Sequence, residues 1–200
     1  MFTYLLIFIN AIISYKAYTA SQSGSYQEMD KYLYRPYQLS RGGNIPGVIL
    51  SNFSHADFFH FLFNMMTLFY FGRVVEYSAG FITFLSIYFL SGVGATLISY
   101  FRKKDDPYYQ ALGASGCISG ILVTAAILYP QMSLYMMFIP IPIPAPIFAV
   151  LYILFSTLLM NSDSGIAHDA HLGGALVGLI AGGILAGGYG AFFSQLFKLF

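Results

Sequence analysis

Six apolar stretches follow one another along the chain. They lie at about residues 2–19, 56–76, 81–101, 114–129, 146–160 and 171–187. A bilayer-spanning helix needs roughly 20 mostly apolar residues, so the fourth and fifth stretches must start below the membrane surface or lie in a thinned patch. All six are predicted to be helices, because backbone groups in hydrocarbon must bond within their own segment unless a closed barrel forms, and nothing here alternates like barrel strands.

The connections between these stretches differ in character. Residues 20–54 are the only long polar segment and mix aromatic with charged side chains, which indicates a structured element at the membrane interface. Residues 102–110 form a short charged loop. Residues 139–147 (IPIPIPAPI) are excluded from a helix interior because their prolines lack backbone donors. Pro144 or Pro146 suits the first turn of the fifth helix.

The composition favours one membrane domain over residues 1–200. Hydrophobic residues make up 58% and charged residues 8%, whereas a typical soluble domain carries about 25% charged residues. The formal net charge of +1 gives no electrostatic case for a nucleic-acid partner, and the single cysteine excludes an intrachain disulfide. Because no basic residue precedes Lys16, the N-terminal stretch is interpreted as a retained first span and not as a signal peptide.

The second apolar stretch carries a polar stripe. His60 and Asn64 lie one helical turn apart and therefore share a face. Ser54 with Asp57 resembles a helix-start capping pair, which would place His55 in the first turn of this helix. Polar residues in spans are costly and usually face the bundle interior, where they either bond neighbouring helices or take part in function.

Small residues line one face of the fourth stretch and one face of the sixth. The face of the fourth stretch carries Gly113, Gly116 and Gly120, with Ser115 and Ser119 in the adjoining row. The face of the sixth carries His171, Gly174, Gly178 and Gly182. Such faces let helices approach closely and alone are a weak functional signal. Here one face brings a serine and the other a histidine, each near the start of its helix.

The segments HADFFHFLFN, GASG and AHLGGALVG together resemble the rhomboid family of intramembrane serine proteases. They occur in the family's order and cover its six-span core. The resemblance implies an all-helical polytopic membrane protein with Ser115 as the nucleophile and His171 as its base. It also implies that His60 and Asn64, with the backbone N–H of Ser115, stabilise an oxyanion.

The chemistry of these residues is coherent without the family. A serine hydroxyl becomes an effective nucleophile when a base takes its proton, and histidine titrates in the useful range. Ser115 is expected in the first turn of its helix, where unpaired N–H groups and the helix dipole favour negative charge. Asp169 is two residues from His171 and on another helix face, so we expect a dyad. The expected supporting residues are His55, Gly113, Gly116 and Gly174.

Cys117, Ser119 and His168 allow other assignments. Cys117 points to another side of the helix than Ser115 and is interpreted as packing. Ser119 lies one turn deeper, and the GxSG pattern fits only Ser115. His168 and His171 could bind a metal with His55 or His60, but thiolate and acidic ligands are lacking at suitable positions. Neither a metal nor another cofactor is expected.

The chain departs from the family pattern at two places. Many members carry Trp-Arg shortly before the second span, where this chain has Pro46 and Gly47. Some members have a tyrosine four residues after the nucleophile that packs on the catalytic histidine, and this chain has Ser119 there. Neither residue is needed for a dyad, but loop geometry and substrate preference do not transfer.

Orientation rests on the resemblance, which implies a cell membrane with both termini in the cytoplasm and residues 20–54 and 102–110 outside. Basic residues oppose this arrangement. Those outside would be Lys16, Lys31, Arg35, Arg41, Arg102, Lys103 and Lys104, and those inside Arg73 and Lys198. This distribution is contrary to the positive-inside tendency.

The sequence thus predicts a serine endopeptidase that cleaves in or near the transmembrane segments of other membrane proteins. The resemblance implies a water-filled cavity and lateral substrate entry past the fifth helix, with that helix and the connection 161–170 as moving parts. Two alternatives are a catalytically inactive relative that binds membrane clients and a transporter with a histidine-lined path. Both serine and histidine are present, which disfavours the first, and few charged residues lie within spans, which disfavours the second.

Overall fold

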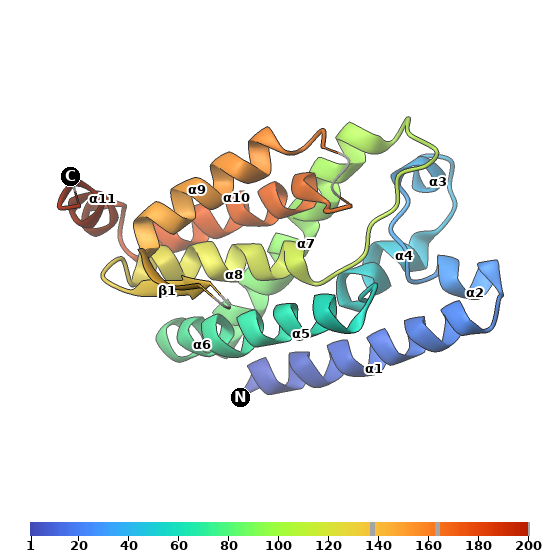
Figure 1. Ribbon diagram of the computed structural model, residues 1–200, viewed down its shortest axis with the longest axis horizontal. Coiled ribbons are helices and arrows are strands. Elements are labelled where there is room, and N and C mark those ends of the chain that lie inside the picture. The colour runs from blue at the N-terminus through green and yellow to red at the C-terminus, as the bar shows by residue number, and fades with distance from the viewer. Residues whose placement is uncertain (137–138, 163–164, 200) are drawn as a thin grey trace.

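The computed structural model describes residues 1–136, 139–162 and 165–199, most of them in helices (Figure 1). The six apolar stretches are all helical. They form α1 (Phe2–Gln22), α5 with α6 (Phe58–Thr67 and Arg73–Ala79, joined by a π-helical turn, Leu68–Gly72), α7 (Phe81–Lys103), α8 (Ser115–Leu128), α9 (Ala145–Leu158) and α10 (His168–Leu185). Short helices α2 (Tyr26–Asp30), α3 (Pro36–Leu39) and α4 (Ile45–Leu50), a 3-10 turn (Ser51–Phe53) and α11 (Gly190–Phe197) complete the set.

Among the described residues, three helices are long and apolar enough to cross a membrane. They are Phe58–Ala79, Phe81–Lys103 and His168–Leu185. The apolar helices α8 and α9 have 14 residues each, which at 1.5 Å per residue is about 21 Å, short of a hydrocarbon core of about 30 Å. The chain is therefore an integral membrane protein. The helices of its fourth and fifth apolar stretches, α8 and α9, are short, as the sequence predicts.

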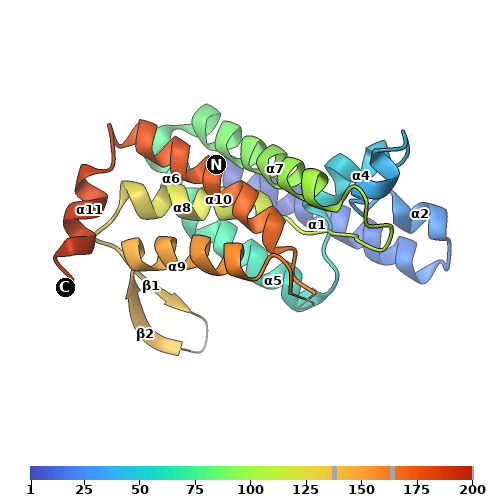
Figure 2. The same ribbon diagram turned by 90° about the horizontal axis from the view of Figure 1, so that it is seen from above.

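Helix α8 lies at the centre of the bundle. Every residue from Gly116 to Ile127 is buried, and Figures 1 and 2 show α5, α7, α9 and α10 around it. Helix α7 packs on both α8 and α10, since Gly94 of α7 meets Gly173 of α10 backbone to backbone. The core of this protein is thus built on a helix whose whole surface faces other helices.

The glycine faces of α8 and α10 lie against each other. A Cβ at Gly174 would clash with the carbonyl oxygen of Gly116, and one at Gly178 would clash with the backbone of Gly120. The order of these contacts shows that the two helices run parallel, so their first turns lie at the same end. Close backbone approach is a main source of helix association in lipid, where no hydrophobic effect drives helices together.

Gly113 is not part of this contact, contrary to the sequence prediction. Helix α8 begins at Ser115, and Gly113 precedes it with φ +133°. Its N–H donates to the carbonyl of Ser51 at 2.8 Å, which holds the entry to α8 against the 3-10 turn. A glycine is needed because L side chains rarely adopt this φ.

The predicted capping pair at the start of the second span is wrong. Asp57 alone caps α5, because its Oδ1 accepts the N–H of His60 at 2.8 Å, the N-cap to N3 spacing. The Ser54 hydroxyl instead donates to the carbonyl of Leu50 at 2.8 Å. His55 therefore lies before the helix and not in its first turn.

A β-hairpin, absent from the sequence prediction, joins α8 to α9. Strands β1 (Ser133–Met136) and β2 (Ile139–Pro144) pair antiparallel, with Leu134 opposite Ile143. Alternate prolines are compatible with an edge strand, where every second backbone nitrogen points away from the partner. Helix α9 then starts at Ala145 with Pro146 in its first turn, as predicted. In the connection 161–170, residues 163 and 164 lie outside the described residues.

We predict that Gly174→Ala lowers the thermal stability of the protein in detergent. Its new methyl group would press on the Gly116 carbonyl, and overpacking of this kind costs about 1–3 kcal/mol of the free energy of unfolding. Gly190→Ala is the matched control, because nothing lies within 4 Å of its added Cβ. Equal melting temperatures for the two variants would contradict a close α8–α10 contact.

Candidate active site

Ser115 and His171 meet where α8 and α10 begin. Ser115 is the first residue of α8, and His171 lies in the first turn of α10. The Ser115 Oγ and the His171 Nε2 are 2.8 Å apart, a hydrogen bond. With Nε2 as the acceptor, the ring carries its proton on Nδ1. The arrangement places a hydroxyl beside an imidazole nitrogen that can take its proton.

Asp169 does not orient the His171 ring. Its carboxylate accepts the hydroxyl of Tyr109 at 2.9 Å and the N–H of Ala170 at 2.9 Å. Burial raises the pKa of Tyr109, a residue of the loop before α8, so its phenol stays a proton donor. The carboxylate thus ties the start of α10 to that loop, in keeping with its expected place on another helix face.

His60 and Ser115 flank a space left by Gly113. A methyl group at Gly113 would lie 2.8 Å from the His60 Nε2 and 3.5 Å from the Ser115 Oγ. An atom bound to both groups would occupy this space. The sequence predicted Gly113 as a supporting residue on a packing face. In the structure, the absence of a side chain at Gly113 instead leaves room for the His60 imidazole close to the backbone beside Ser115.

Asn64 is buried one turn deeper on α5 than His60. Its Nδ2 donates to the carbonyl of His60 at 2.8 Å. An amide nitrogen carries two hydrogens, so this bond leaves the second one for another acceptor. The structure thus places His60 at the Gly113 space and holds the Asn64 amide against its own helix.

His55 joins three parts of the fold. Its Nε2 accepts the N–H of Ala114 at 3.4 Å, and its Nδ1 lies 2.8 Å from the Ser14 Oγ. Since the Ser14 hydroxyl donates to the carbonyl of Phe53 at 3.0 Å, the Nδ1–H of His55 is the donor to Ser14. Both ring nitrogens of neutral His55 are therefore used, and they fix the residue that precedes α8.

The environment of His55 keeps it neutral. Burial, with a smaller effect from the neighbouring His60, lowers the pKa of His55 to about 3. The rings of His55 and His60 meet edge to face with centroids 5.0 Å apart. His55 is therefore a structural hydrogen-bonding group at physiological pH.

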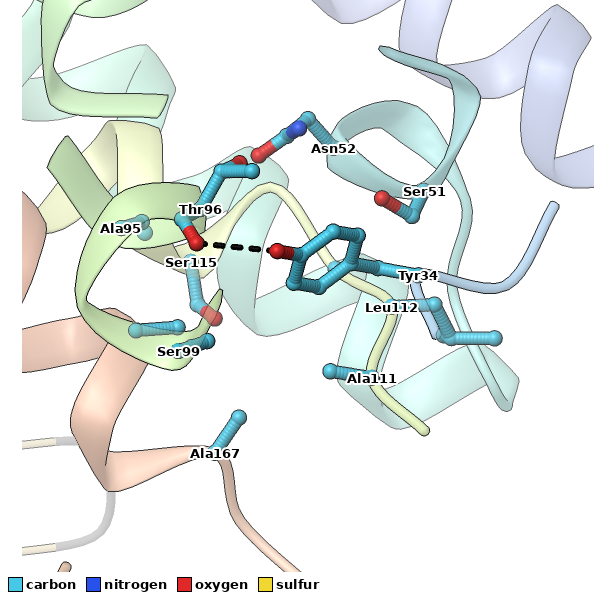
Figure 3. Close-up of a pocket in the computed structure, with 13 residues that line it drawn as sticks. Tyr34, Ser51, Asn52, Ala95, Thr96, Ser99, Ala111, Leu112, Ser115 and Ala167 are labelled. Atoms are coloured by element: carbon cyan, nitrogen blue, oxygen red, sulfur yellow. Dashed lines mark hydrogen bonds between the residues drawn. The ribbon is translucent and has the colours of Figure 1, made fainter. Parts of the chain in front are cut away.

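A small cavity lies behind Ser115 (Figure 3). Its volume is about 30 Å³, room for roughly one or two water molecules. Polar lining groups come from Ser115, Ser51 and Ser99, and the Tyr34 hydroxyl donates to the carbonyl of Thr96 at 3.0 Å beside it. Tyr34 is also paired backbone to backbone with Ala111, which ties the 20–54 segment to the loop before α8. The polar N-terminal segment thus closes one side of the site.

The sequence did not reveal the aromatic neighbour of His171. The Tyr152 ring of α9 stacks on it with centroids 6.1 Å apart and planes at 19°. A phenol in the middle of a mostly apolar helix was the available signal. The His168 ring meets His171 edge to face at 5.9 Å. Among the residues that the structure describes, no three His, Cys, Asp or Glu side chains are grouped to hold a metal ion.

Fold and site together define an integral membrane protein with a serine–histidine pair where two glycine-faced helices begin. Residues 42–188 match the model of the Rhomboid domain. The chain belongs to the rhomboid family, which confirms the resemblance seen in its motifs.

The chain is similar to several curated relatives of this family. It is 30% identical over 165 residues to "Rhomboid protease AarA" of Providencia stuartii, covering 72% of this chain and 57% of that protein. It is 29% identical over 157 residues to "RHOMBOID-like protein 12, mitochondrial" of Arabidopsis thaliana, covering 70% and 46%. It is 32% identical over 139 residues to the human "Presenilin-associated rhomboid-like protein, mitochondrial", covering 66% and 36%. The matched part is thus between about a third and three fifths of each relative.

We predict that acidification destabilises the protein partly through His55. The unfolded residue has a pKa near 6.5 and the folded one about 3, so its contribution is complete above pH 6.5 and is lost as the pH falls toward 3. The slope for one such group reaches about 1.4 kcal/mol per pH unit. Thermal unfolding in detergent at pH 7.5 and pH 5 should show a smaller pH effect in His55→Gln than in the wild type. Equal pH effects would contradict a neutral buried His55.

Proposed function

We propose that this protein is an intramembrane serine endopeptidase. Its substrates are membrane proteins, cleaved in or near their transmembrane segments, with Ser115 as the nucleophile and His171 as the base. The observation that carries the proposal is the 2.8 Å hydrogen bond between the Ser115 Oγ and the His171 Nε2. The protease named among the relatives supports the same activity.

The reaction follows from this pair. His171 Nε2 takes the hydroxyl proton as the Ser115 Oγ attacks the scissile carbonyl carbon, and the resulting imidazolium gives that proton to the leaving amine. The acyl group remains on Ser115. In the second step, His171 takes a proton from a water molecule as that water attacks the ester carbonyl. His171 then returns the proton to the Ser115 oxygen as the carboxylic product leaves.

Stabilisation of the oxyanion is assigned to groups around the Gly113 space. The His60 imidazole borders this space opposite Ser115, and the N–H of Ser115 is in the first turn of α8, where backbone donors lack intrahelical partners. Asn64 would contribute the second hydrogen of its amide. These donors are most effective when fixed before the charge develops, in a site shielded from bulk water.

The cavity behind Ser115 supports the second step of the reaction. Its volume suffices for a water molecule, and serine and tyrosine hydroxyl groups on its walls provide hydrogen-bonding partners. Hydrolysis of the acyl-enzyme requires water beneath the membrane surface. The cavity would hold that water beside the ester.

The proposed arrangement in the membrane is a six-span core in a cell membrane, with cytoplasmic termini. Helix α8 has only 14 residues, which would place Ser115 below the surface of the bilayer. Substrate would enter sideways past α9, whose outward face carries large apolar side chains such as Leu154 and Phe155. The intact Ser115–His171 pair favours a protease over a client-binding relative without activity.

We predict that Ser115→Ala and His171→Ala each abolish cleavage of a single-span test substrate in liposomes. Neither change removes a packing contact of the glycine faces, so both variants should stay folded. A fluorophosphonate should label the wild type and not Ser115→Ala. The exposed Ser21→Ala on α1 is the matched control and should cleave normally. Residual turnover by purified Ser115→Ala would contradict the assignment.

His60→Ala and Asn64→Ala should lower kcat more than they change KM. Each removes one donor to the oxyanion, and loss of such a donor costs about 10²–10³ in kcat. Steady-state cleavage in detergent measures both parameters. An unchanged kcat in either variant would remove that residue from the proposed oxyanion site.

A further inference from the structure

Helix α9 places one aromatic side chain directly against the serine–histidine pair. The rings of Tyr152 and His171 are nearly parallel, with centroids 6.1 Å apart and planes at 19°. This is the offset stacked arrangement, which aromatic pairs prefer at centroid distances of about 4.5–7 Å. A rotation of the His171 ring about its side-chain bonds would press on the Tyr152 ring. The contact therefore restricts the orientation of the proposed base.

The Tyr152 hydroxyl is tied to the helix that carries Ser115. It lies 2.5 Å from the Ser119 Oγ, and the Ser119 Oγ donates to the carbonyl of Ser115 at 2.6 Å. Because a serine hydroxyl has a single hydrogen, that donation makes Tyr152 the donor to Ser119. The bond direction runs from Tyr152 through Ser119 to the backbone of Ser115.

These contacts form a closed circuit across three helices. Ser115 is bonded to His171, His171 is stacked on Tyr152, and Tyr152 is bonded through Ser119 back to Ser115. Each member limits the movement of the next. A connected circuit of this kind holds its groups more firmly than a single pairwise contact does.

Besides Tyr152, α9 packs Phe148 and Ile153 against the core of the bundle. Ala149 and Ser156 are its buried residues on either side of Tyr152 along the helix, whereas Leu154 and Phe155 are exposed. Phe148, one turn before Tyr152, stacks on the Tyr152 ring at 5.8 Å and 20°. Movement of α9 away from α8 would therefore withdraw the stacked ring from His171.

We infer that Tyr152 is a positioning residue for His171, which holds the imidazole toward Ser115 when α9 is packed against α8. The inference rests on the proposed function. It gives α9 a second task beside that of bordering the path of the substrate. The packing of α9 against α8 sets the alignment of the His171 imidazole. Ser115 and His171 are therefore aligned while α9 is packed on α8, and His171 loses its support when α9 moves away.

The test measures two rates on purified full-length protein in detergent. One is the rate constant for labelling Ser115 by a small fluorophosphonate, which reports the serine–histidine pair without requiring a transmembrane substrate to enter. The other is steady-state cleavage of a single-span substrate, resolved into kcat and KM. Tyr152→Leu should slow labelling and kcat about ten- to a hundredfold with little change in KM, since misalignment of a catalytic group costs that much.

Tyr15→Leu on α1 is the matched control. It makes the same change at an exposed position away from α9 and should label and cleave as the wild type does. If Tyr152→Leu labels as fast as the wild type, the inference on Tyr152 is overturned and the proposed function stands. If the wild type is not labelled at Ser115, the proposed function is overturned and the inference falls with it.

A second set of variants covers the case in which Tyr152→Leu does not fold. Tyr152→Phe keeps the stacked ring and Ser119→Ala keeps the phenol, but each breaks the same hydrogen bond, so each should slow labelling about two- to tenfold. The double variant should be no slower than Ser119→Ala alone, because that change already breaks both the bond from Tyr152 and the bond to the Ser115 carbonyl. Independent, multiplying effects, or no effect in either variant, would overturn the inference.

Discussion

The backbone contact between α8 and α10 is the constraint on which the site depends. Gly174 and Gly178 let α10 lie directly on the backbone of α8, and the parallel direction of the helices brings their first turns together. Ser115 and His171 each occupy such a turn. Main-chain geometry thus brings the two residues within reach of each other, and no long side chain separates the helices at this contact. Preorganised groups of this kind need little rearrangement during a reaction.

Around this contact, the polar groups of the site are held by hydrogen bonds from every neighbouring segment. His55 connects α1 to the residue before α8, and Tyr34 connects the N-terminal segment to the same loop. Asp169 ties the start of α10 to Tyr109. Buried polar groups are costly unless paired, so these bonds offset the burial and also fix the entry points of two helices. The same hydrogen bonds therefore position the side chains of the site and stabilise the fold.

Much of this arrangement could be predicted from the sequence, and the rest depends on contacts that the sequence does not encode locally. The spacing of the glycines predicted the close helices, and the resemblance of the motifs to the rhomboid family implied the pairing of Ser115 with His171. The place of His55 was missed because Ser54 and Asp57 both fit a cap, and only the fold selects between them. The hairpin was missed because six residues of alternating isoleucine and proline indicate an irregular segment as readily as a strand. Tyr152 was missed because its partner lies on another helix.

Apolar residues have two different surroundings in this protein: some face other helices, and others lie on the outside of the bundle. The residues of α8 from Gly116 to Ile127 face protein on all sides, so their composition serves the interior of a bundle, as in the core of a water-soluble domain. Large exposed apolar side chains lie instead on the outer helices, such as Leu90 and Leu97 on α7 and Leu154 and Phe155 on α9. Lipid that surrounds the bundle therefore has no direct contact with these α8 residues, and a change in lipid thickness or fluidity would have to reach them through the outer helices.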